Sequence, residues 1–114
     1  MNKYIKNITL NNNKLSQEQI TNRVKSFERL YRSKHANLVI TDEKITFTLY
    51  NKLPYEKLVN QLVKERYSDS EEFAILRKAL NGFNEEFYIY NTYVEECKVK
   101  AREFVAEREA IINE

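Results

Sequence analysis

The first ten residues alternate weakly between apolar and polar positions. Tyr4, Ile8 and Leu10 have the same parity along the chain, which is the period of a half-buried β-strand. Three Asn residues at positions 11–13 then interrupt the alternation, as turn residues do. We expect an edge strand or a frayed arm at the N-terminus.

A helical period follows, and it begins at a capping box. In the segment 16–19, the Ser16 hydroxyl can accept from the N–H of Gln19, and the Gln19 side chain can reach back to the Ser16 N–H. Beyond it, apolar residues recur every three or four positions, which predicts a helix from about Gln17 to Ser33. The positions are Ile20, Val24, Phe27 and Tyr31.

The period changes to two over residues 38–41 and 45–50. Ile45, Phe47 and Leu49 share one face of the second stretch, and β-branched and aromatic residues dominate both. The intervening residues 42–44 contain no glycine, so we expect a hairpin with a type I turn. The first half therefore predicts strand–helix–strand–strand, with the helix on one face of a small sheet. If the first two strands are parallel and in one sheet, their connection should be right-handed.

Three helices are predicted in the second half. Pro54 suits the first turn of a helix, Ser68 is a favourable N-cap, and Asn81-Gly82 tolerates the left-handed conformation that ends helices. The expected ranges are 54–67, 68–82 and 84–111. The predicted fold class is α+β: a small sheet followed by a three-helix C-terminal half.

Charge divides the chain at the same place. Residues 1–53 carry ten Lys/Arg against four Asp/Glu, and residues 54–114 carry nine against thirteen. We expect a basic α+β unit at 1–53 and an acidic helical unit at 54–114, or one continuous domain. The two charges either neutralise each other in the fold or present two different surfaces to partners.

Residues that perform chemistry are scarce. The chain has one His, one Cys, one Gly and no Trp, whereas it has eight Tyr and six Phe. Cys97 lies on an apolar helical stripe, which predicts a buried, inert thiol. His35 follows a basic helix end, where a turn residue or a C-terminal cation is expected. We predict a protein that is not an enzyme, with no catalytic residue, no metal site and no cofactor.

The sequence shows neither a membrane-spanning run nor a signal peptide. No apolar run approaches the roughly 20 residues that span a bilayer, so no membrane association is expected. The first ten residues lack the apolar core of a signal peptide. A single Cys fits a reducing compartment, so we expect a cytoplasmic protein.

Two surfaces are candidates for binding. The first is the basic helix 17–33 with its flank, which is a solvated face, a phosphate-binding surface or a site for an acidic partner; nucleic acid is not favoured, because the chain is not strongly basic. Its cations are Arg23, Lys25, Arg29, Arg32 and Lys34. The second is the last helix, where Phe83, Phe87, Tyr90 and Val94 form a stripe expected to face the preceding helices. Tyr88 and Tyr93 leave this stripe, so we expect them to be accessible and to bind a partner.

Residues from about Leu53 to Ala106 resemble a small C-terminal motif of phage and prophage proteins from Gram-positive bacteria. The resemblance is carried by segments 55–59, 62–68, 72–78 and 90–98. It implies a protein encoded near tail, baseplate or fibre genes and acting in the host cytoplasm, and it brings no catalytic residues.

Three hypotheses follow. The leading one is a non-enzymatic phage accessory protein that acts by protein–protein contact, such as a tail or fibre assembly factor. Its partner would be a phage structural protein or a host protein, and a homo-oligomer stays open. The alternative is a phage-encoded inhibitor of a host defence or nucleic-acid-processing protein. The third is a nucleic-acid-binding protein that uses the basic helix.

Overall fold

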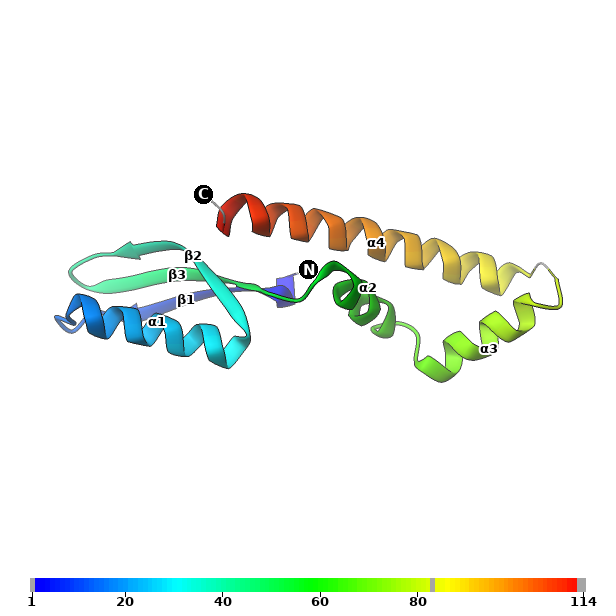
Figure 1. Cartoon of the computed structure of the whole chain (residues 1–114), viewed down its shortest axis with the longest axis horizontal. Coiled ribbons are helices and arrows are strands. Elements are labelled where there is room, and N and C mark those ends of the chain that lie inside the picture. The colour runs from blue at the N-terminus through cyan, green and yellow to red at the C-terminus, as the bar shows by residue number, and fades with distance from the viewer. Residues whose placement is uncertain (1, 83, 113–114) are drawn as a thin grey trace. The chain divides into compact units, whose positions relative to one another are not determined.

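A computed structural model describes residues 2–82 and 84–112 of the chain. The fold class is α+β, as the sequence predicts. The elements follow one another as a short 3₁₀ turn at Asn2–Tyr4, β1 at Ile5–Asn11, α1 at Gln17–Tyr31, β2 at Ser33–Ile40, β3 at Lys44–Asn51, α2 at Tyr55–Lys64, α3 at Asp69–Ala79 and α4 at Glu85–Ile112 (Figure 1).

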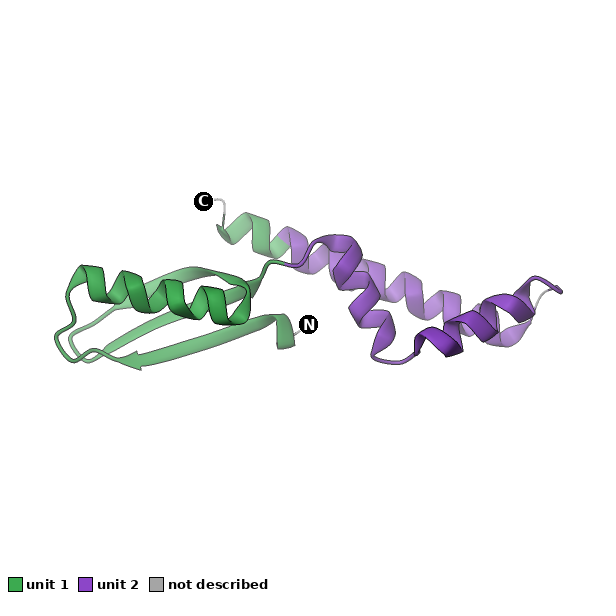
Figure 2. Cartoon of the chain, turned by 60° about the horizontal axis from the view of Figure 1, so that its bottom comes forward, with its two compact units in different colours: residues 1–52, 107–114 green, residues 53–106 purple. Residues whose placement is uncertain are grey.

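The chain divides into two compact units, which Figure 2 colours separately. Unit 1 comprises residues 1–52 and 107–114, and unit 2 comprises residues 53–106. Residues 107–112 of α4 therefore belong to unit 1, although α4 is one continuous helix. None of the helices described is both long enough and apolar enough to cross a bilayer.

Unit 1 is a three-stranded sheet with α1 along one face (Figure 1). The strand order is β1-β3-β2, and both outer strands run antiparallel to β3. β1 and β2 are thus parallel to each other, with α1 as the crossover between them. The predicted inner face of β3 is confirmed, because Ile45, Phe47 and Leu49 are buried in the core with Ile20 and Val24 of α1.

The two ends of α1 differ in how well the sequence predicts them. At its start the capping box is confirmed: the N–H of Gln19 donates to Ser16 Oγ at 3.2 Å, and the N–H of Ser16 donates to Gln19 Oε1 at 2.8 Å. Its end comes earlier than residue 33, since Arg32 adopts a left-handed conformation at φ 49°. Ser33 then begins β2 and donates its hydroxyl to the Tyr31 carbonyl at 2.8 Å.

His35 consequently lies within β2, so its expected place at a helix end or in a turn is wrong. Its backbone N–H donates to the Glu28 carboxylate at 2.9 Å, and its Nδ1 lies 3.1 Å from the same oxygen. Burial alone would raise the pKa of Glu28, but the hydrogen bonds from His35 and the nearby charges of His35 and Lys34 together lower it. The pair ties the sheet to α1.

Unit 2 contains α2, α3 and residues 85–106 of α4. Each helix starts where the sequence predicts: Pro54 is the N-cap of α2, Ser68 caps α3, and Asn84 Oδ1 accepts from the N–H of Phe87 at 2.7 Å. Gly82 lies in the turn between α3 and α4 with φ +126°, a conformation that other residues rarely adopt. Cys97 is buried, 2 % exposed, as expected from its stripe.

The capping box of α3 is open to a simple test. Ser68→Ala removes the oxygen that accepts from the N–H of Glu71 at 3.2 Å, so we expect a loss of about 1 kcal/mol in the free energy of unfolding. Ser70→Ala, two residues into the same helix, is the matched control and should change the stability by a few tenths of that or less. Urea unfolding followed by circular dichroism measures both, and equal effects would show that the cap is not stabilising α3.

Candidate functional site

Large apolar side chains are exposed together on one side of α3. The exposed fractions are 71 % for Phe73, 47 % for Leu76 and 88 % for Leu80. With Phe87 of α4 they border a hollow of about 560 Å³, which Ala79, Gly82 and Arg77 complete. We call this surface the α3–α4 groove. A contiguous apolar patch of this kind on a folded domain typically marks a site of interaction.

Contacts on the opposite side of α3 hold the helix in this orientation. The Tyr90 hydroxyl donates to the Glu72 carboxylate, and Lys78 pairs with Glu86 at 3.4 Å. Because these contacts run in opposite order along the two helices, α3 and α4 are antiparallel. Ile75, which lies between Glu72 and Lys78 in the sequence, is 3 % exposed. The burial of Tyr90 and its bond to Glu72 raise the pKa of this phenol to about 12.

Tyr93 is half-buried and so is less accessible than the sequence predicts. Its hydroxyl donates to the Leu62 carbonyl at 2.8 Å, its ring centroid lies 5.7 Å from that of Tyr67, and the Arg66 guanidinium lies 5.1 Å from its ring. Burial, followed by the neighbouring Cys97 thiol, raises the pKa of Tyr93 to about 12. The side chain thus packs α4 against α2.

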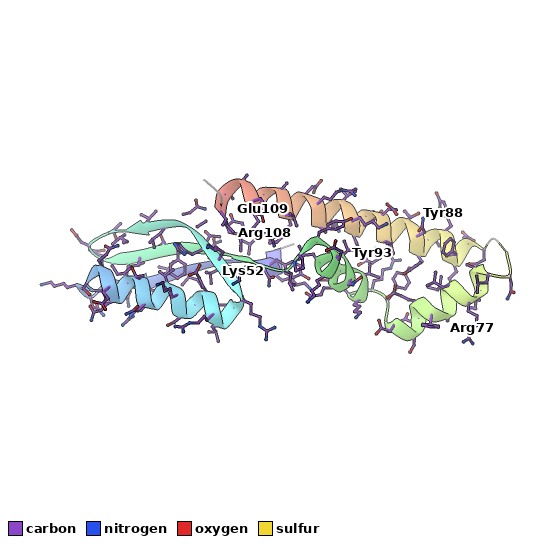
Figure 3. The ribbon with its side chains drawn as sticks, viewed as in Figure 1. Lys52, Arg77, Tyr88, Tyr93, Arg108 and Glu109 are labelled. Carbon is purple, nitrogen blue, oxygen red and sulfur yellow. The ribbon has the colours of Figure 1, made fainter. Side chains whose placement is uncertain are left out.

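Tyr88 is as accessible as expected, with 62 % of its side chain exposed. It lies on the outer side of α4, whereas Tyr93 lies on the side toward α2 (Figure 3). Both nevertheless border one hollow of about 230 Å³, with Arg66, Ile89, Thr92 and Glu96. Partner binding by these two residues stays a prediction.

The residues of the predicted aromatic stripe differ in how deeply they are buried. Tyr90 is buried and Val94 is half-buried, as expected for the side toward the other helices. Phe87 is half-buried and lines the α3–α4 groove, so it belongs to the surface as well as to the packing. Phe83 lies outside the described residues.

The structure brings together three of the five cations of the predicted basic cluster. Lys25, Arg29 and Lys34 line a hollow of about 400 Å³ in unit 1, with Glu28 and Ser33. Arg23 and Arg32 are exposed but do not line it. Lys52 does, and sequence reasoning missed it. The pairing of Ser33 with Asn51 places Lys52 beside the end of α1, and only the register of the hairpin reveals this.

Cys97, the one cysteine of the chain, is a free thiol and is buried. Burial raises the pKa of the Cys97 thiol, which disfavours the nucleophilic thiolate. Across residues 2–82 and 84–112, no three His, Cys, Asp or Glu side chains are grouped so that they could hold a metal ion.

The packing role of Tyr93 is testable by pH. Both raised phenol pKa values lie above the value of about 10 in the unfolded chain, so the contribution of the two phenols to stability is fully present below pH 10 and is lost as the pH rises toward 12. Tyr93→Phe should lower the free energy of unfolding at pH 7 by about 1 kcal/mol, because the Leu62 carbonyl keeps the N–H of Glu65 but loses the Tyr93 hydroxyl as a donor. It should also make the loss of stability at alkaline pH shallower.

Tyr88→Phe is the control, since this exposed hydroxyl has no partner among the described residues that its loss would affect. Urea unfolding at a series of pH values measures all three proteins. If Tyr88→Phe and Tyr93→Phe behave alike, the bond to Leu62 is not formed in solution.

Comparison of the chain with models of known protein families, with curated proteins and with solved structures finds no match.

Proposed function

We propose that this chain is a non-enzymatic protein-binding module, and that the α3–α4 groove receives an amphipathic helix of another protein. The observation that carries the proposal is the exposure of Phe73 and Leu80, each more than two-thirds open to solvent, beside a hollow with an almost wholly apolar lining. Burying such side chains contributes of the order of 1–2 kcal/mol each.

The shape of the groove favours a helix as its occupant. Phe73, Leu76 and Leu80 follow the i, i+3, i+7 spacing of residues that face a neighbouring helix. The groove is bordered by α3 and by Phe87 of α4, so a further helix laid along it would add to the three helices of unit 2. Arg77 at its border can pair with an acidic residue of that helix.

The buried thiol and the engaged imidazole support a role that does not involve catalysis. Cys97 is buried with a raised pKa, and Nδ1 of His35 is held by Glu28 at 3.1 Å. A nucleophile needs a thiolate and a free base, whereas burial disfavours the Cys97 thiolate and Glu28 engages the His35 imidazole.

The resemblance to phage proteins supplies the finer part of the proposal. The residues that carry it, 53–106, are the residues of unit 2, which also contains the groove. We therefore propose a phage structural protein as the partner, with the chain acting in tail or fibre assembly. A host protein captured by the same groove would instead indicate the inhibitor role.

Crosslinking tests the proposal at the level of single positions. A photoreactive phenylalanine analogue in place of Leu80 should crosslink to the partner in phage-producing cells, whereas the same analogue in place of Lys57, an exposed residue of α2, should not. A third position, Tyr88, tests the other hollow of unit 2. Mass spectrometry identifies the crosslinked protein.

Calorimetry with the purified partner then measures how much the groove residues contribute to binding. Phe73→Gln combined with Leu80→Gln should weaken its binding at least about tenfold, because two apolar anchors are lost, while Tyr88→Gln should leave it nearly unchanged. A partner that crosslinks only through Tyr88, or that binds the double variant as tightly as the wild type, contradicts the proposal.

A further inference from the structure

A second surface lies on unit 1, where cationic side chains from three segments meet. Lys25 and Arg29 come from α1, Lys34 from β2, and Lys52 directly follows β3. The backbone fixes this convergence, because the N–H of Lys52 donates to the Arg32 carbonyl at 3.1 Å at the point where α1 passes into β2. We call the hollow of about 400 Å³ that these four residues line the cationic hollow.

The acidic residue in the lining of this hollow, Glu28, already has a partner. Glu28 is bound by the N–H and Nδ1 of His35. The four cations, in contrast, form no ion pair with any carboxylate among the residues that the structure describes. The hollow therefore carries an excess of positive charge that the fold itself does not neutralise.

The positive surface continues on the other side of Lys34 and Lys52. These two lysines also line a neighbouring hollow of about 250 Å³, with Arg108, Glu109 and Ile112 of α4. Figure 3 labels Lys52, Arg108 and Glu109 in this region of unit 1. Nε of Arg108 lies 3.3 Å from the carboxylate of Glu109, so the acidic residue that lines this second hollow is paired too.

We propose that the cationic hollow binds phosphate groups of a nucleic-acid backbone. Every residue that lines it is polar or charged, whereas a protein partner would need an apolar anchor at the centre of the contact. Phosphates need only cations and polar donors. Lys25 and Arg29 are four residues apart on α1, so their Cα atoms are spaced by roughly 6 Å along the helix and can contact successive phosphates.

The binding should not depend on base sequence. Recognition of single-stranded bases uses exposed aromatic rings. The two aromatic residues of α1, Phe27 and Tyr31, instead stack on each other with a centroid distance of 6.3 Å and pack against the core. The side chains lining the hollow are Lys, Arg, Glu and Ser, which hold a backbone in position. This site is separate from the α3–α4 groove, so the two proposals succeed or fail independently.

Fluorescence anisotropy with a short labelled DNA duplex of mixed sequence tests the proposal. We expect a dissociation constant of the order of 10⁻⁵ M at low salt, and a slope of log K against log[NaCl] of about −3 to −4, since each of four phosphate contacts adds about 0.9. Replacing Lys25, Arg29, Lys34 and Lys52 together by Gln should weaken binding at least about tenfold and flatten the slope. The double variant Lys25→Gln/Lys52→Gln should lose about half of the slope.

The matched control replaces four other exposed cations, Lys14, Lys44, Lys57 and Lys100, by Gln and so lowers the net charge by the same amount. Binding that falls equally in both quadruple variants would reflect net charge alone and would overturn the proposal. Undetectable binding of the duplex to the wild type would overturn it as well. Tighter binding of a labelled polyglutamate peptide than of the duplex would overturn it in favour of an acidic protein.

Discussion

The rotation of α3 about its own axis is the constraint on which the candidate binding surface depends. That rotation is fixed by Glu72, which accepts from the Tyr90 hydroxyl, by the burial of Ile75 and by the pairing of Lys78 with Glu86. Turning the helix to bury Phe73 would take Glu72 away from the buried Tyr90 side chain and break the hydrogen bond between them. The apolar arc of α3 is wider than the face that α4 covers, so Phe73, Leu76 and Leu80 remain outside.

Features that depend on neighbours in the sequence could be predicted from it. The hairpin follows from the period-two pattern around Ile45, Phe47 and Leu49, and the helix starts follow from Ser16, Ser68 and Asn84, whose side chains bond within three residues. Cys97 is buried because it lies on an apolar stripe, a property that the sequence displays directly.

Features that depend on tertiary contacts could not be predicted. Periodicity identifies the apolar residues of α3, but it does not say whether Ile75 or Phe73 meets α4. Tyr93 lies off the main stripe of its helix, and only the position of α2 gives its hydroxyl the Leu62 carbonyl. His35 enters β2 because Arg32 ends α1 early, and Lys52 joins the cationic hollow through the register of β2 and β3.

The account rests on the claim that the apolar face of α3 contributes little to folding and is available for binding. Urea unfolding of Phe73→Gln/Leu80→Gln beside Ile75→Ala tests this most directly, because the three positions lie in α3 or at its C-cap but differ in burial. The account predicts a loss of less than about 1 kcal/mol for the double variant and of about 2–4 kcal/mol for Ile75→Ala. A double variant that is destabilised as much as Ile75→Ala would show that Phe73 and Leu80 belong to the core, which would contradict the account.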